Sequence, residues 1–107
     1  MPDEIYSNLT FNNNYKSISN FYPEGTIVSS GLSKWCGAGG WRLGFFAIPK
    51  QLEDLKNGLK TLCSESFTSV SAPIQHAAIE AYIGDHSAYL TSVKKILSFT
   101  GNYAYEN

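Results

Sequence analysis

The sequence predicts an α/β chain in which short strands come first and three helices follow. Residues 26–29 form a short run rich in β-branched side chains, and residues 41–48 form an apolar run that stops at Pro49. Both patterns are typical of strands, and the second predicts a buried strand. After Pro49 the spacing of apolar residues changes from about two to about three and a half, which is the period of a helix. This order of elements favours an α/β layer.

Turns and loops fill the segments around the two predicted strands. The run Asn12, Asn13 and Asn14 predicts an exposed turn, because asparagine tolerates left-handed backbone. Another turn at residues 23–25 precedes the first strand. Residues 30–40 are rich in glycine, which disfavours regular structure and lets other groups approach the backbone closely. We therefore expect an irregular loop between the strands.

Each of the three predicted helices has its own signal. The first has leucines on one stripe, which is typical of an amphipathic helix. The second begins at Ser71, has Pro73 in its first turn and ends at Gly84. The third begins with Asp85 or Ser87 as its cap and has no stop signal before the end of the sequence. The stripe of the first helix is Leu52, Leu55, Leu59 and Leu62, and the buried face of the second is Ile74, Ala77, Ala78, Ala81 and Tyr82.

Composition excludes several classes of protein. The 107 residues have the length of one modest domain, and their formal net charge of -1 provides no basic surface for a nucleic-acid backbone. Cys36 and Cys63 form neither a dense disulfide framework nor a metal-binding pair, so we expect two reduced thiols and no metal site. The sequence has no long apolar run and no order typical of a signal peptide. We therefore expect a cytoplasmic protein with no membrane or nucleic-acid partner.

The segment from Gly31 to Gly44 is the part of the sequence that indicates chemistry. It matches neither common phosphate-binding motif, because its lysine precedes the glycines and Arg42 stands where a third glycine is needed. Lys34 follows the first strand on small-residue backbone, where a lysine can attack a carbonyl and form a Schiff base. Arg42 offers a fork of donors suited to a phosphate dianion. The pair predicts a site for a phosphorylated aldehyde, and the alternative is two surface cations beside a flexible loop.

This segment closely resembles the pyridoxal-phosphate attachment motif of the class I and II aminotransferases, a family of fold type I. The resemblance implies that Lys34 forms the Schiff base with the cofactor and that Arg42 grips its phosphate. It also implies transfer of an amino group between an amino acid and a 2-oxo acid, with Lys34 as nucleophile and then general base. The matching positions are Gly31, Leu32, Ser33, Lys34, Gly37, Ala38, Gly40, Arg42, Leu43 and Gly44.

A second match lies upstream, where residues 3–6 resemble the Asp-x-x-Tyr element of the same family. The resemblance assigns Asp3 to the pyridine nitrogen of the cofactor and Tyr6 to its phenolic oxygen. A carboxylate beside the ring nitrogen favours the protonated ring, which is the better electron sink. A hydrogen bond from Tyr6 would stabilise the anionic phenolic oxygen.

The sequence departs from the family pattern at one position. Several branches place a phosphate-binding serine three residues before the lysine, and here that position is Gly31. Ser30 is therefore the first substitute candidate for contacting the phosphate, and Ser33 is the second. Trp35 and Trp41 are expected to pack against the protein and not to stack on the cofactor ring.

The resemblance also implies how much of an enzyme the chain contains. Members of the family are several times longer, so residues 1–107 are expected to be the C-terminal part of the cofactor-binding large domain. The chain would end in the helix that leads to a missing small domain, and the full-length form would be a homodimer. We expect little or no transaminase activity from this chain alone. Another fold type I enzyme, such as a β-lyase or an acyl-transferring synthase, and a non-catalytic truncated remnant stay open as alternatives.

Overall fold

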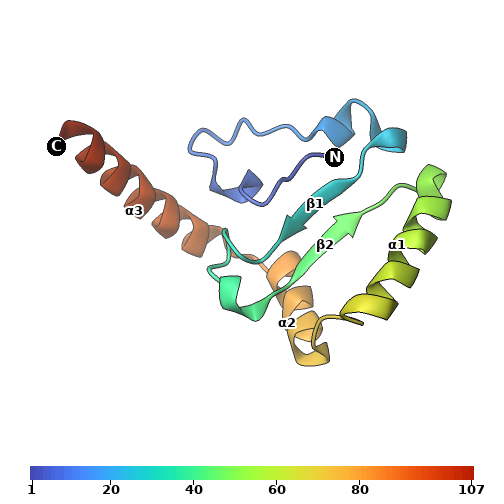
Figure 1. The fold of residues 1–107 in the computed structure, drawn as a ribbon. Helices are drawn as coiled ribbons and strands as arrows, with labels where there is room; N and C mark the ends of the chain where they lie inside the picture. The colour runs from blue at the N-terminus through green and yellow to red at the C-terminus, as the bar shows by residue number, and fades with distance from the viewer.

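A two-stranded antiparallel sheet forms the centre of the computed structural model, which describes residues 1–107 (Figure 1). Strand β1, Val28–Gly31, pairs with β2, Gly44–Ala47, so that Val28 lies opposite Ala47 and Gly31 opposite Gly44. Strand β1 lies two residues later than predicted. The second strand is shorter than the predicted run 41–48, because residues 39–41 form a 3-10 turn and Arg42 has left-handed backbone.

The N-terminal segment lies along the other edge of β1. Asp3 pairs with Ser29 in parallel fashion. The Glu4 N–H donates to the Ser29 carbonyl at 2.8 Å, and the Ser29 N–H donates to the Pro2 carbonyl at 3.0 Å. These two hydrogen bonds fix Asp3 beside the strand that leads to Lys34.

The three predicted helices are confirmed as α1, Glu53–Ser66, α2, Ala72–Ile83, and α3, Ser87–Glu106. Ser71 occupies the position before α2 and Gly84 the position after it, as predicted. Neither predicted cap of α3 is confirmed, because His86 occupies the capping position and makes no side-chain capping hydrogen bond. The Asp85 carboxylate, one residue earlier, accepts the Ser87 N–H at 3.0 Å. None of these helices has both the length and the apolar character that a membrane span requires.

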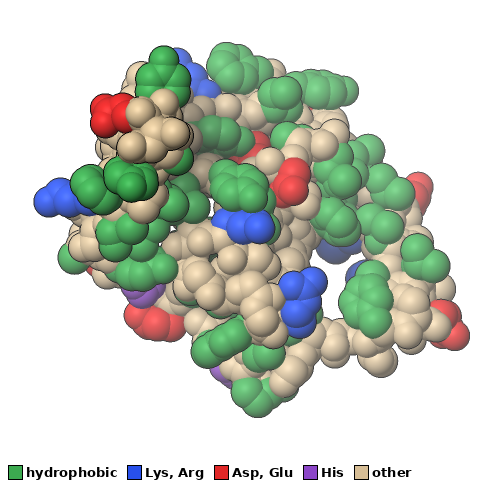
Figure 2. Space-filling view, turned by 60° about the vertical axis from the view of Figure 1, so that its left-hand side comes forward, with side chains coloured by type: hydrophobic (Ala, Val, Ile, Leu, Met, Phe, Trp, Pro, Cys, Tyr) green, Lys and Arg blue, Asp and Glu red, His purple; other side chains and the backbone are tan.

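The buried core is small and consists of Leu32 and Trp35 from the loop after β1 together with Ala78 from α2. Helices α1 and α3 project to opposite sides of the sheet (Figure 1), and neither contains a buried residue. Hydrophobic side chains consequently lie at many places on the surface (Figure 2). Both cysteines are free thiols, as predicted.

Several burial predictions are wrong for this chain. All four residues of β2 are exposed, although the run predicts a buried strand. On the predicted buried face of α2 only Ala78 is buried, and Tyr82 is exposed. Trp35 packs in the core as predicted, but Trp41 is 52% exposed. The common physical reason is that a sheet of two strands offers too little surface to cover the apolar faces of three helices.

Gly31 lies where the two strands come closest. A Cβ atom at this position would lie 2.6 Å from the Leu43 carbonyl oxygen and 3.1 Å from the Gly44 Cα. Both neighbours are backbone atoms, one in β2 and one in the residue before it, so neither can move aside without moving the strand. This crowding explains why no serine stands three residues before Lys34.

We expect Gly31→Ala to destabilise the fold by about 1–3 kcal/mol, the usual effect of forcing extra volume into a packed position. Urea unfolding followed by circular dichroism measures this loss. Gly40→Ala is the matched control, because a Cβ atom there meets nothing within 4 Å, and it should change stability by less than about 0.5 kcal/mol. Equal effects of the two substitutions would contradict the close approach at Gly31.

The hydrogen bond from the Ser87 N–H to the Asp85 carboxylate predicts a dependence of stability on pH. The Ser87 backbone N–H that donates to Asp85 lowers the pKa of this carboxyl below its ordinary value of 3.8. A lowered pKa in the folded chain adds stability that is fully present above the ordinary value and is lost as the pH falls through the lower one. Asp85→Asn keeps an oxygen acceptor that does not titrate. The unfolding midpoint of the unmodified chain should therefore fall more steeply than that of Asp85→Asn between about pH 5 and pH 2, and parallel curves would rule out a stabilising role for this hydrogen bond.

Candidate functional site

Lys34 lies in a tight turn immediately after β1. The turn is closed by the Gly37 N–H, which donates to the Lys34 carbonyl at 3.3 Å, and by the Ala38 N–H, which donates to the Leu32 carbonyl at 3.2 Å. Gly37 has a φ of +66, which glycine adopts without strain. Leu32 and Trp35 are 2% and 4% exposed, whereas Lys34 between them is exposed. Burial of the two neighbours thus anchors the turn and directs the lysine away from the core.

The Lys34 amine lies beside the ring of Tyr6. Its Nζ is 5.7 Å from the centroid of the ring, a distance at which the π face attracts a cation. Both residues line a cavity of about 670 Å³, here called the Lys34 cavity. Its walls come from the N-terminal segment, the Lys34 turn and α3. The other lining residues are Leu9, Thr10, Phe11, Ser33, Val93 and Leu97.

Asp3, Ser30 and Arg42 line a second, smaller cavity of about 220 Å³, here called the Arg42 cavity. Asp3 lies along the edge of β1, Ser30 lies in β1, and Arg42 directly follows the 3-10 turn of residues 39–41. The Arg42 Nη1 donates to the Gly39 carbonyl at 2.8 Å. A carboxylate and a guanidinium therefore line the same hollow.

The five predicted site residues are thus divided between two cavities, two in one and three in the other. Ser33 lines both cavities. Ser33, the second candidate for a phosphate contact, is thus the one residue that the two cavities share. The contribution of Phe11 and of α3 to the wall beside Lys34 was missed, because these residues carry no signal beyond an apolar pattern typical of a core.

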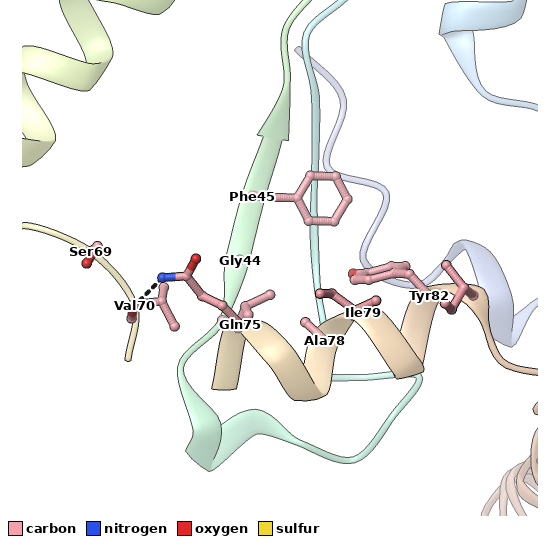
Figure 3. Close-up of a pocket in the computed structure, with 10 residues that line it drawn as sticks. Gly44, Phe45, Ser69, Val70, Gln75, Ala78, Ile79 and Tyr82 are labelled. Carbon is pink, nitrogen blue, oxygen red and sulfur yellow. Dashed lines mark hydrogen bonds between the residues drawn. The ribbon is translucent and has the colours of Figure 1, made fainter. Parts of the chain in front are cut away.

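A third cavity of about 570 Å³ lies between β2 and α2 and contains none of the predicted site residues (Figure 3). Phe45 and Tyr82 meet there edge to face, with ring centroids 5.4 Å apart. The Gln75 amide donates to the Val70 carbonyl at 2.6 Å. Partial burial raises the pKa of Tyr82 above its ordinary value of 10.0, and nearby Trp35 and Ser30 oppose this shift. The lining is mostly apolar and contains no lysine, arginine or carboxylate, so we place the candidate site on the Lys34 side.

Comparison with known proteins identifies the family of the chain. Residues 1–103 match the family model described as aminotransferase class I and II. A probable N-acetyl-LL-diaminopimelate aminotransferase of Bacillus subtilis is 37% identical over 81 residues, which cover 76% of this chain and 20% of that protein. An aspartate aminotransferase of Geobacillus stearothermophilus is 37% identical over 88 residues, which cover 78% of this chain and 22% of that protein.

A more distant relative is the aspartate/prephenate aminotransferase of Thermus thermophilus, which is 32% identical over 81 residues covering 76% of this chain and 20% of that protein. No solved structure gives a significant match. The chain spans about a fifth of the length of these relatives. The match over residues 1–103 nevertheless includes every residue of both site cavities, and it shows that the chain belongs to the class I and II aminotransferase family.

Proposed function

We propose that this chain supplies the cofactor-binding part of a pyridoxal-phosphate-dependent aminotransferase. The reaction is the transfer of an amino group between an amino acid and a 2-oxo acid. The observation that carries the proposal is that two cavities share the lining residue Ser33, one lined also by the Lys34 amine and the other by a carboxylate and a guanidinium. Members of the class I and II family use pyridoxal phosphate.

The side chains of the two cavities fit the chemistry of that cofactor. The aldehyde of the cofactor forms a Schiff base with a lysine amine, and Lys34 is exposed in the Lys34 cavity. A phosphate dianion requires cations and hydroxyl donors, which Arg42 and the two serines, Ser30 and Ser33, provide. A pyridine nitrogen is held protonated by a carboxylate, and Asp3 is the only carboxylate in either cavity. Tyr6 adds a phenol for the ring oxygen.

When bound, pyridoxal phosphate supplies an electron sink for the substrate's α-carbon. Lys34 provides the nucleophilic amine and afterwards moves the proton that leaves the α-carbon. The Lys34 Nζ lies 5.7 Å from the centroid of the Tyr6 ring, so the ring helps to position the amine in the cavity. Asp3 holds a proton at the ring nitrogen, and Arg42 fixes the phosphate so that the reacting atoms stay in register.

We further propose that residues 1–107 form the C-terminal part of a fold type I large domain. The observed α/β order of short strands followed by three helices supports this assignment. Lys34 is the only cation in its cavity, so no group there is free to grip the carboxylate of a substrate. We infer that a small domain and a second subunit of a longer homodimeric protein would complete the substrate site. The chain alone should therefore show little or no transamination.

The central test is covalent capture of pyridoxal phosphate at Lys34. Incubation of the chain with pyridoxal phosphate followed by borohydride reduction should add one cofactor mass at Lys34, located by peptide mass spectrometry. Lys34→Ala should abolish this adduct together with the visible absorbance of the imine. Lys60→Ala on exposed α1 is the control and should leave both signals unchanged. Retention of the absorbance in Lys34→Ala would overturn the assignment.

A second test separates phosphate binding from imine formation. Arg42 has left-handed backbone, with a φ of 57, so Arg42→Gly removes the guanidinium without straining the chain. Loss of a charged hydrogen bond should weaken capture of pyridoxal phosphate by roughly tenfold to a hundredfold. Capture of pyridoxal, which lacks the phosphate, is the internal control and should change by less than about twofold. An equal loss for both aldehydes would contradict a phosphate-binding role.

A further inference from the structure

We propose that Asn13 and Lys94 are positioning residues for the Lys34 cavity. Their hydrogen bond fastens the N-terminal segment that carries Tyr6 to helix α3, and so holds two walls of the cavity at a fixed separation. The inference rests on the proposed function, because it assumes that the Lys34 amine and the Tyr6 ring act together.

The contact is a long-range hydrogen bond between side chains. The Lys94 Nζ donates to the Asn13 Oδ1 at 2.9 Å across 81 positions of sequence. No other side-chain hydrogen bond joins the first twenty residues to any of the three helices. Lys94 is half-buried and forms no ion pair, so the Asn13 amide is its polar partner.

The backbone at Asn13 explains why asparagine suits this position. Its φ of 54 lies in the left-handed region, which asparagine tolerates better than most residues. The preceding Asn12 side chain supports the turn by accepting the Asn14 N–H at 3.3 Å. Glycine at position 13 would satisfy the backbone but offer no acceptor. Most other side chains would strain the backbone, so asparagine or aspartate alone meets both conditions.

The hydrogen bond lies directly behind the wall of the Lys34 cavity. Phe11, two residues before Asn13, lines the Lys34 cavity and also the adjoining cavity of about 540 Å³ that contains Asn13 and Lys94. On the helix, Val93 lies next to Lys94 and Leu97 lies one turn further, and both line the Lys34 cavity. Separation of the two walls would move Tyr6 and Phe11 away from α3. The backbone pairing with β1 holds the start of this segment, and the hydrogen bond to Lys94 holds its far end against α3.

Four substitutions isolate the role of the hydrogen bond. Asn13→Gly keeps the left-handed backbone and removes the acceptor, whereas Asn13→Asp keeps both. Lys94→Met removes the donor. Lys95→Met is the matched control, because Lys95 lines the same outer cavity but makes no hydrogen bond to Asn13.

The readouts are the fraction of Lys34 captured by pyridoxal phosphate, the pH at which the absorbance of the adduct titrates, and hydrogen exchange of residues 6–14 without cofactor. Asn13→Gly and Lys94→Met should each lower capture by roughly threefold to tenfold, shift the titration and speed exchange of residues 6–14. Their double variant should lose no more than either single one, because both remove the same interaction. Asn13→Asp and Lys95→Met should behave as the unmodified chain does.

Three results would overturn the inference: an Asn13→Gly effect no larger than that of Lys95→Met, an equal loss in Asn13→Asp and Asn13→Gly, or additive losses in the double variant. A titration that does not shift in any variant, with exchange altered throughout the chain, would assign the pair a structural role only. Failure of the unmodified chain to form an adduct at Lys34 would instead disprove the proposed function, and hydrogen exchange would still test the fastening itself.

Discussion

Burial of Leu32 and Trp35 against α2 is the interaction on which the candidate site depends. These two residues flank Lys34, and both belong to the three-residue core. Burial of a large apolar side chain contributes about 1.5–3 kcal/mol relative to exposure, far more than any contact that Lys34 makes itself. The indole N–H of Trp35 is buried without a hydrogen-bond partner, which costs part of that gain. The lysine is therefore positioned by its neighbours and keeps its own amine available for chemistry.

The rest of the chain is held together more weakly than this turn. Its Cα radius of gyration is 16.4 Å, compared with about 13 Å for a compact domain of this length. A sheet of two strands is marginal without further packing, and here both faces of β2 are exposed. The apolar stripes of α1 and α3 likewise lie on projecting helices. Local interactions, such as backbone hydrogen bonds and the tight backbone contact at Gly31, consequently hold the region around the site.

Local sequence predicted local features well and burial poorly. The helices follow from apolar period, and the boundary residues Ser71 and Gly84 follow from preferences that act within a single turn. The strand ends differ from the predicted ones, because the close approach at Gly31 and the left-handed backbone at Arg42 depend on how the two strands pair. Exposure of β2 could not be predicted, since an apolar run indicates what a strand would bury and not what is present to cover it.

In the candidate site, too, the residues were predicted from local sequence and their arrangement was not. The motif around Lys34 and the Asp-x-x-Tyr element named five residues, but their distribution over two cavities that share Ser33 is a property of the folded chain. The hydrogen bond between Asn13 and Lys94 spans 81 positions, and no local pattern predicts such a contact. The Asn12–Asn14 run predicted a turn correctly, and only the fold reveals the acceptor that this turn presents.

Backbone strain coincides with the candidate site at one residue, Arg42. Three residues other than glycine have a positive φ, namely Asn13, Arg42 and Thr68. Such a conformation costs on the order of 1 kcal/mol or more for a residue such as arginine, and it persists only where the surrounding structure enforces it. At Arg42 the 3-10 turn before it and the pairing of Gly44 with Gly31 after it provide that enforcement. The guanidinium then donates to the Gly39 carbonyl beside the Arg42 cavity. On binding of a phosphate, the guanidinium would exchange this neutral acceptor for a dianion, which is the stronger acceptor.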